Sequence, residues 1–203
     1  MAGNRKSAQD RKAEIVATAI RLAGEHGPDR VTTQQLADAI GITQPAIFRH
    51  FPTKADIWLA VGKALTGKVA PTSGVTDIPD NTPDGDPLGM LQEIVIRHLR
   101  QIERTPAIPA ILFSRELHAE NEPLRRHFEA VINRRRAGLA QLIGQAGKAG
   151  HISNETNAAD VAALLLAIVH GMAMRWSLEN RTFDLVGEGT RLVKVVIGGL
   201  KSR

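Results

Sequence analysis

Apolar residues recur along the chain at the spacing of α-helices, and no segment alternates apolar and polar residues as a half-buried strand does. The first helix ends at Gly27-Pro28, and its apolar face carries Thr18 as a small polar exception. The apolar positions of that face are Ile15, Ala19, Leu22 and Ala23. Further helices are expected in 31–54, where two are short, and over 53–65, 88–102, 108–118, 124–142, 157–179 and 184–200. The pattern predicts an all-α protein of about nine helices.

Residues 31–54 carry the pattern of two short helices joined by a tight turn. Their apolar and small positions are Leu36, Ala37 and Ile40 in the first helix, Ile42 in the turn, and Ile47 and Phe51 in the second. Gly41 occupies the reversal, where a left-handed backbone favours glycine. Thr43 is placed to cap the second helix, and Pro45 suits its first turn. This pattern indicates a helix-turn-helix and therefore DNA binding.

Composition along the chain predicts the domain organisation. Residues 1–54 are expected to form a three-helix DNA-binding domain, and 55–70 a connecting helix with the apolar residues Ile57, Trp58, Val61 and Leu65. Residues 71–87 are rich in Pro, Gly, Asp, Thr and Ser, which predicts an exposed, flexible loop. Residues 88–203 are expected to form a second helical domain.

The last two helices are apolar around more than half of their circumference, so both are expected to be buried on two sides. A four-helix bundle with a second copy of the chain would provide that burial. The expected dimerisation residues are Ala163, Ala167, Gly171, Leu192, Val193, Val196, Ile197 and Leu200. The alternative is that these faces only cover the core of one monomer. A two-fold dimer is favoured because two DNA-binding modules on a palindrome multiply specificity.

Composition narrows the class of protein. With no cysteine, the chain has neither disulfides nor thiolate zinc sites. The hydrophobic fraction of 43% predicts a globular protein, and the longest apolar run, Val161 to Val169, is too short to cross a bilayer. A polar N-terminus then makes a cytoplasmic location the expectation. The net charge is +5, and residues 1–54 carry eight basic against five acidic residues, so the positive excess leans toward the helix-turn-helix.

One set of residues in the helix-turn-helix occurs in a register that is typical of a known family. These residues are Thr32-Thr33, Leu36-Ala37, Gly41, Gln44-Pro45, Phe48, His50-Phe51 and Lys54. With them, the first 65 or so residues resemble the TetR family of bacterial transcriptional regulators. The resemblance implies an N-terminal DNA-binding domain and a divergent helical C-terminal domain that binds an inducer and dimerises through its last two helices. The C-terminal half carries no motif that identifies a ligand class.

The resemblance also implies roles for individual residues. The expected DNA-binding residues are Thr32, Thr33, Gln34, Thr43, Gln44, Pro45, Ala46, Arg49, His50 and Lys54. Thr33 would cap the second helix and, with Thr32, touch phosphate, while Gln34 would face the major groove. Gln44, Pro45 and Ala46 would lie against base edges, where glutamine suits adenine. Arg49 would reach a guanine or a phosphate, and His50 and Lys54 would bind phosphate. Phe48 replaces the tyrosine that is common in the family, so that phosphate contact should be absent.

Polar and aromatic residues within the apolar stripes of the later helices are candidates for a mostly apolar effector pocket. They are His98, Phe113, Arg115, His118, Phe128, His170, Met172, Met174 and Trp176. For each of them alone, a role in the core or on the surface is the alternative. A metal site of His98, His118 and His170 has no support from spacing, so no metal or cofactor is expected. The run Arg134-Arg135-Arg136 predicts a solvated helix face with Arg135 partly inward, with a second nucleic-acid site as the alternative.

No catalytic motif stands out from ordinary helix surfaces, so the chain is not expected to be an enzyme. The leading hypothesis is a homodimeric transcriptional regulator, a repressor that a small-molecule effector releases from a palindromic operator. One alternative is an effector-independent DNA-binding protein with a structural or partner-recruiting role. A metal-dependent enzyme built on the histidines is a weaker alternative.

Overall fold

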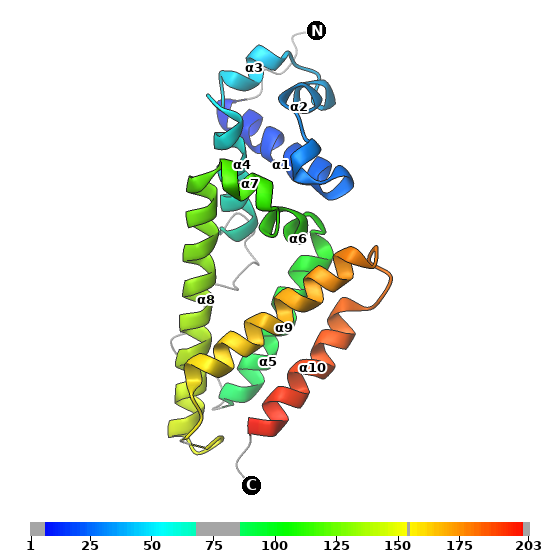
Figure 1. The fold of residues 1–203 in the computed structure, drawn as a ribbon. Helices are drawn as coiled ribbons and strands as arrows, with labels where there is room; N and C mark the ends of the chain where they lie inside the picture. Colours follow the sequence, from blue (N-terminus) through cyan, green and yellow to red (C-terminus); the bar gives the residue numbers. More distant parts are fainter. Residues whose placement is uncertain (1–6, 68–85, 154, 201–203) are drawn as a thin grey trace. The chain divides into compact units, whose positions relative to one another are not determined.

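The computed structural model describes residues 7–67, 86–153 and 155–200, and these contain ten α-helices and no β-strand (Figure 1). The helices are α1 (Ala8–His26), α2 (Thr33–Ala39), α3 (Gln44–Phe48), α4 (Lys54–Thr66), α5 (Pro87–Arg104), α6 (Ala107–Leu112), α7 (Arg115–Glu120), α8 (Glu122–Lys148), α9 (Ala158–Leu178) and α10 (Leu185–Leu200). A short 3-10 helix follows α1 at Pro28–Arg30. The all-α fold class is therefore confirmed.

The helix count exceeds the expected nine because the single helix predicted over 108–118 is two helices. Ser114 separates α6 from α7 and caps the latter, since its Oγ accepts a hydrogen bond from the Leu117 backbone N at 3.1 Å. The same hydroxyl donates to Asp29 Oδ1 at 2.8 Å. The predicted loop 71–87 lies outside the described residues except for its end, where Asp86 caps α5 and Pro87 begins it.

The chain divides into two compact units. One contains Met1–Val69 and Ala110–Glu129, and the other contains Ala70–Pro109 and Ala130–Arg203. Helix α8 contributes its first residues to the N-terminal unit and the rest to the C-terminal unit. The sequence-based division placed all of 88–203 in one domain, whereas Ala110–Glu129 clusters with the N-terminal unit. The domain boundaries at 54, 70 and 87 stay a prediction.

Hydrophobic side chains of α1 to α4 form the core of the N-terminal unit. Helix α1 packs against α4 and α2, and α2 packs against α3. The core includes Ile15, Ala19, Leu36, Ala37, Ile47, Ile57, Trp58, Val61 and Leu65. The apolar residues expected in the fourth helix are therefore buried as predicted, whereas Leu22 of the first helix is only half-buried. Capping boxes begin α1 at Ser7, α2 at Thr32 and α4 at Thr53.

The start of α8 lies against α4 within the same unit. Buried Asn121 donates from Nδ2 to the Ala55 carbonyl at 2.9 Å, and its Oδ1 accepts from the Leu124 backbone N at 3.1 Å. Thr66 Oγ1 lies 2.6 Å from His127 Nε2. The two helices therefore share polar contacts at both ends of α4.

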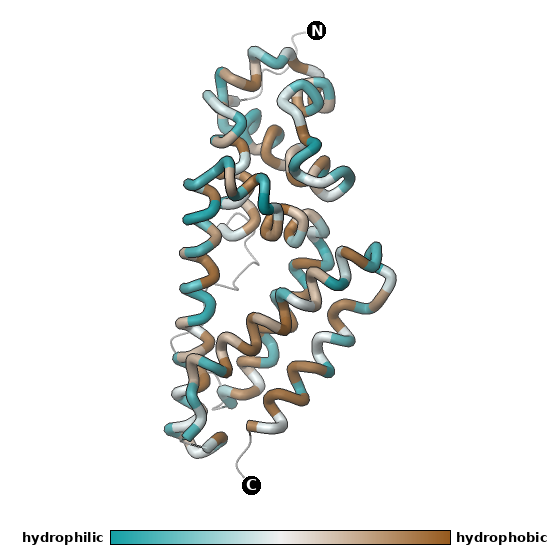
Figure 2. The backbone as a smooth tube through the Cα atoms, viewed as in Figure 1, coloured by the Kyte–Doolittle hydropathy of each residue, from teal (hydrophilic) through white to brown (hydrophobic). Residues whose placement is uncertain are grey.

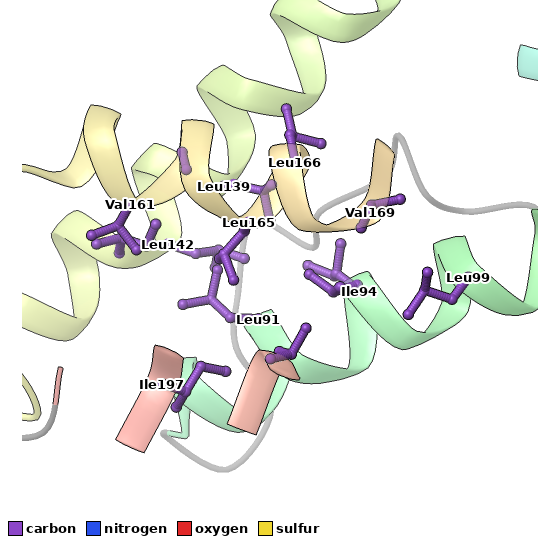
Figure 3. Close-up of a cluster of buried hydrophobic side chains, with 14 of the residues drawn as sticks. Leu91, Ile94, Leu99, Leu139, Leu142, Val161, Leu165, Leu166, Val169 and Ile197 are labelled. Carbon is purple, nitrogen blue, oxygen red and sulfur yellow. The ribbon is translucent and has the colours of Figure 1, made fainter. Parts of the chain in front are cut away.

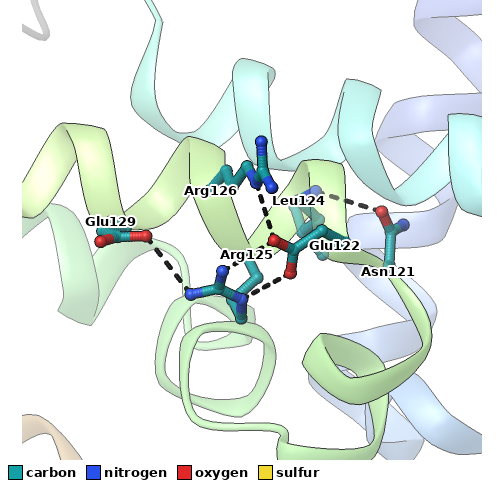
Figure 4. Close-up of polar contacts among 6 residues, drawn as sticks. All are labelled: Asn121, Glu122, Leu124, Arg125, Arg126 and Glu129. Carbon is teal, nitrogen blue, oxygen red and sulfur yellow. Dashed lines mark hydrogen bonds and ion pairs between the residues drawn. The ribbon is translucent and has the colours of Figure 1, made fainter.

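Charged residues stabilise the first turns of α8 (Figure 4). The Glu122 carboxylate accepts hydrogen bonds from Arg125 and Arg126 at 2.7 to 2.8 Å, and Arg125 also reaches Glu129 at 3.3 Å. The bonds from Arg125 and Arg126 lower the pKa of Glu122 to about 2. Glu122 is thus an anion at neutral pH, at a helix N-terminus where negative charge is favourable.

Gly62 of α4 lies close to the side chain of Leu124 on α8. A Cβ built at Gly62 would lie 2.5 Å from Leu124 Cδ1, and Leu124 is fully buried. We expect Gly62→Ala to lower the unfolding free energy by about 0–2 kcal/mol, because overpacking outweighs the helix preference of alanine. Gly144→Ala in α8 is the matched control: its added methyl meets nothing within 4 Å, so it should stabilise by about 1 kcal/mol. Urea unfolding of both variants measures the difference, and equal stabilisation would contradict the close packing.

The C-terminal unit encloses the larger core between α5, α8, α9 and α10 (Figure 3). Leu91, Leu142 and Leu165 contribute from three different helices and are 0–1% exposed. Gly189 allows α10 to approach α5, since a Cβ there would lie 2.4 Å from Leu99 Cδ1. Hydrophobic residues recur along α9 and α10 in particular (Figure 2).

Helix α9 is long and apolar enough to cross a membrane by length and composition. The expectation that its apolar run is too short rested on Val161 to Val169, but the whole helix has 21 residues. Eight of them are buried, and they form part of the C-terminal core. A core helix of a water-soluble protein has the same properties.

Candidate functional site

The helix-turn-helix predicted for residues 31–54 is present as α2, a tight turn and α3. Gly41 has φ +69°, the left-handed conformation expected there. The turn closes with a hydrogen bond from the Ile42 backbone N to the Ala37 carbonyl at 3.0 Å. Pro45 lies in the first turn of α3 as predicted, and Ile47 is the buried residue of this helix. The scaffold thus holds α3 by one apolar face and leaves the remaining faces for a partner.

Thr32, and not Thr33, is the cap of α2. Thr32 Oγ1 accepts from the Gln35 backbone N at 3.1 Å, and Gln35 Oε1 accepts from the Thr32 backbone N at 2.9 Å. Thr33 is buried, and its Oγ1 accepts a hydrogen bond from Gln44 Nε2 at 2.7 Å. The expected capping role of Thr33 was therefore wrong, and its hydroxyl orients the first residue of α3. Thr43 holds the N-cap position of α3, but its side chain makes no capping hydrogen bond.

Gln44 keeps the atoms that recognition of a base requires. One N–H of its amide is engaged by Thr33, which leaves the second N–H and the carbonyl oxygen for a bidentate contact. Glutamine pairs in this way with the N6 and N7 edge of adenine. Gln34 on α2 is exposed, and its Nε2 donates to Asp38 Oδ1 at 2.6 Å, a bond that also leaves one N–H and the carbonyl oxygen of the amide for other contacts.

The basic residues beside α3 have no acidic partner in the described part of the chain. Arg49 and Lys54 are exposed and His50 is half-buried, and none of the three takes part in an ion pair with a described residue. Pro45 is exposed, Ala46 is half-buried, and Phe48 is 40% exposed. An exposed surface of unpaired positive charge next to a base-reading amide matches the requirements of a DNA duplex.

The nine expected effector residues are divided between the two units. Phe113, Arg115, His118 and Phe128 belong to the N-terminal unit, and the other five belong to the C-terminal unit. His118 Nε2 donates a hydrogen bond to the Leu112 carbonyl at 2.9 Å, and its ring packs edge-on against Phe128. Met172 and Trp176 are core residues, whereas Met174 is 37% exposed. Which of these residues contact an effector stays a prediction.

His98 is an expected effector residue that lines a small cavity in the C-terminal unit. The cavity has a volume of about 10 Å³, which is room for one water molecule. Its lining is Ile94, Val95, His98, Arg135, Leu139, Leu166 and Val169. Arg135 Nη1 lies 2.8 Å from His98 Nε2. The expectation that Arg135 points partly inward is confirmed, since it is half-buried.

Burial shifts the pKa of each titratable group in this cluster. Burial lowers the pKa of His98 well below its ordinary value, and Arg135 and His170 lower it further. Burial and Arg135 also lower the pKa of His170. Burial lowers the pKa of Arg135 to about 10, so Arg135 is still a cation at neutral pH. Both histidines are neutral at that pH because their pKa is lowered. His98 Nε2 therefore accepts the hydrogen bond from Arg135, and its proton is on Nδ1.

The unfolding free energy should fall as the pH drops below 6.5. His98 and His170 have the ordinary pKa of 6.5 in the unfolded chain and a lower pKa when folded, so only the unfolded chain takes up protons just below pH 6.5. The two histidines contribute fully to the unfolding free energy above pH 6.5. This contribution is lost as the pH falls toward their pKa in the folded protein, by up to about 1.4 kcal/mol per pH unit for each histidine. Urea unfolding between pH 7.5 and 5.5 measures this slope. His170→Gln should reduce it, and a flat profile for the native chain would contradict the burial of neutral histidines.

The expected dimerisation residues fall into two groups. Ala163, Ala167, Gly171 and Leu192 are exposed, as a surface for a second copy requires. The others face the chain's own core: Val193 and Ile197 are buried, and Val196 and Leu200 pack against the core. Val193 and Ile197 therefore do not belong to an exposed interface. The same helices expose apolar residues that sequence analysis missed, namely Leu164 (49%), Leu178 (75%) and Val195 (73%).

No group of three His, Asp or Glu side chains that could hold a metal ion occurs among the described residues. His98 and His170 lie in the C-terminal unit with Arg135, while His118 belongs to the N-terminal unit. The three histidines weighed as a metal site are therefore divided between the two units.

Comparisons with known proteins agree with this arrangement. Residues 15–61 match the family model described as bacterial regulatory proteins, tetR family, and residues 109–185 match a tetracyclin repressor-like C-terminal domain. The nucleoid occlusion factor SlmA of Vibrio atlanticus is 31% identical over 177 residues, which are 87% of each chain. The transcriptional regulator TtgR of Pseudomonas putida is 25% identical over 188 residues, 91% of this chain and 88% of that protein.

Solved structures show the same fold. A TetR transcription regulator from Haloarcula marismortui superimposes with a TM-score of 0.79 at 20% identity and covers 96% of this chain and all of that one. The regulator KstR2 of Mycobacterium tuberculosis gives a TM-score of 0.75, also at 20% identity, over the whole of this chain and 99% of that one. With a DNA-binding helix-turn-helix at one end and relatives along its whole length, the chain belongs to the tetR family of bacterial regulatory proteins and is a DNA-binding transcriptional regulator.

Proposed function

We propose that the chain is a homodimeric repressor that binds a palindromic operator through two copies of α3 and leaves it when a small molecule enters the C-terminal unit. The observation that carries the proposal is the surface of α3, where Gln44 keeps a free amide edge beside the unpaired cations Arg49 and Lys54. Specific DNA contacts require both elements, since cations hold the phosphates and amides distinguish the bases.

Dimerisation follows from the exposed apolar residues of α9 and α10. Residues 163, 164, 167, 171, 174 and 178 fall on one side of α9, and all six are exposed. A second copy that covers them would remove apolar surface from water and would place two recognition helices on successive major grooves. We therefore propose Ala163, Leu164, Ala167, Gly171, Leu178, Leu192 and Val195 as the centre of the interface.

Helix α8 offers a path from effector to DNA. Its residues 130–148 help to form the C-terminal core, and its first turns hold α4 through Asn121 and His127. An effector acts only if it binds better to the conformer that fits DNA less well. A shift of α8 that favours such a conformer would be passed to α4, which follows the recognition helix directly in the chain.

The proposal includes a cytoplasmic location and no enzymatic activity. DNA binding requires the compartment that holds the chromosome, and TetR-family regulators act there by binding. Binding alone accounts for the recognition surface of α3, which supports a regulator that performs no reaction.

Retention of labelled genomic fragments tests the proposal. The purified chain should retain a small set of fragments that share an inverted repeat, and an extract of host metabolites should release them. Retention of all fragments alike, at any salt concentration, would contradict sequence-specific repression.

An effector-independent role on the chromosome is the second candidate. The observation that favours it is the identity of 30–31% with SlmA proteins of several Vibrio strains, which are nucleoid occlusion factors. Many dispersed binding sites and no metabolite that releases the DNA would support this role over that of a repressor.

A further inference from the structure

The cavity of the C-terminal unit contains a cation without an acidic partner. Arg135 donates from Nη1 to His98 Nε2, but its Nε is buried with no hydrogen-bond partner. No carboxylate of a described residue pairs with Arg135 within 4 Å, and burial is the cause that shifts its pKa. The two titratable neighbours that act on this group, His98 from α5 and His170 from α9, are both neutral at pH 7.

A half-buried guanidinium in such surroundings is costly. Burying a charge without its counter-ion destabilises a fold strongly, and cores that hold a charge usually pair it. Here the hydrogen bond to His98 orients the guanidinium and leaves the Nε and Nη2 edge unoccupied among the described residues. That edge presents two parallel N–H groups, the arrangement that a carboxylate accepts in a bidentate fashion.

The rest of the cavity is aliphatic. Ile94 and Val95 contribute from α5, Leu139 from α8, and Leu166 and Val169 from α9. No acidic side chain lines it. A ligand that fits this wall has a negative head and a hydrocarbon body.

We propose that the effector is an aliphatic monocarboxylate whose carboxylate pairs with Arg135 and whose chain packs among Leu139, Leu166 and Val169. This inference rests on the proposed function in taking the C-terminal unit as the effector site. His98 acts as a positioning residue, since its neutral ring fixes the guanidinium. The cavity of about 10 Å³ holds one water and no hydrocarbon chain, so the ligand must move the aliphatic side chains of α8 and α9 to enter. Such a ligand necessarily favours a second conformer of the core, which is what an effector requires.

Binding of straight-chain probes to the full chain tests the inference. Hexanoate, octanoate and decanoate are titrated calorimetrically into the native protein, with 1-octanol as the uncharged probe of matched length. At least one carboxylate should bind with a Kd below about 1 mM, and 1-octanol should bind about 10- to 100-fold more weakly than octanoate, because it lacks the charged hydrogen bonds.

Arg135→Met is the decisive variant, and Arg134→Met is its control because Arg134 is exposed on the same turn. Arg135→Met should lose about 10- to 100-fold in carboxylate affinity and keep its affinity for 1-octanol, whereas Arg134→Met should bind as the native chain does. The Tm of ligand-free Arg135→Met should equal or exceed that of the native protein, since the variant removes an uncompensated charge. A Tm in this range also shows that the variant is folded.

Three results would overturn the inference: no carboxylate binds, 1-octanol binds as tightly as octanoate, or Arg135→Met retains carboxylate binding. Failure of the proposed function looks different. If carboxylates bind through Arg135 but leave retention of genomic fragments unchanged, the anion site stands and its role as an effector site is wrong. If a neutral metabolite releases the DNA and carboxylates do not bind, the repressor stands and the anionic ligand class is wrong.

Discussion

Replacing Ala167 by arginine should separate the dimer and weaken operator binding by about 10²- to 10⁴-fold. Ala167 is exposed in the middle of the apolar side of α9, so the longer side chain leaves the monomer fold intact. In the proposed dimer, the same position faces the second copy, where two new charges would be buried next to each other. Without the second copy, each recognition helix must bind its half-site alone. Analytical ultracentrifugation and gel shifts with one operator fragment measure both effects.

Ala137→Arg is the matched control, because Ala137 is exposed on α8 and lies outside the proposed interface. This variant should remain a dimer with native DNA affinity. A dimeric Ala167→Arg variant would place the interface elsewhere. A monomeric variant with native affinity would contradict the claim that two modules act together on one operator.

Gln44→Ala and Lys54→Ala should weaken DNA binding in different ways. Gln44→Ala removes the amide that we propose pairs with a base, so it should cost about 1–3 kcal/mol on the operator and relax the sequence preference at that base pair. Lys54→Ala removes one proposed phosphate contact, so it should weaken binding to all sequences and reduce the salt slope by about one. Gel shifts on operator and random duplexes across a salt series separate the two effects.

Thr33→Val is a sharper test of how Gln44 is held. The substitution keeps the shape of the buried side chain and removes the hydroxyl that accepts from Gln44 at 2.7 Å. We expect a smaller loss in the same direction as Gln44→Ala, with native binding to random DNA. If Gln44→Ala and Lys54→Ala reduced operator and random binding equally, their assignment to base and phosphate would be wrong.

Local signals in the sequence were sufficient to predict the turn of the helix-turn-helix and the start of its second helix. Gly41 at the reversal and Pro45 after it predicted the turn and the start of α3, because each fits a specific backbone conformation. Thr33 was predicted as the cap of α2 in place of Thr32, although a signal for Thr32 was present. Gln35 follows Thr32 by three residues, which is the spacing of a capping box. The break between α6 and α7 was also missed because a capping signal was overlooked. Ser114 is such a signal, since a capping serine can divide an apolar run into two helices.

Contacts between segments that lie far apart in the chain could not be predicted from the sequence. A helix that is apolar all round does not show which side packs on its own chain, so Val193 and Ile197 were placed in the interface while Leu178 and Val195 were overlooked. The grouping of Ala110–Glu129 with the N-terminal unit depends on contacts such as that of Asn121 with Ala55, 66 residues apart. Arg135 did carry a signal, because it continues the apolar stripe of Phe128, Val131 and Leu139 on α8.

Selection of bound duplexes from a random library tests the central claim most directly, namely that the exposed side of α3 reads DNA. The native chain should enrich an inverted repeat whose half-sites are centred one helical turn apart, about 34 Å, or a multiple of that distance. Gln44→Ala should lose the preference at one base pair in each half-site and keep the others. No enriched sequence with the native chain, or the same sequence at full strength with Gln44→Ala, would contradict recognition by α3.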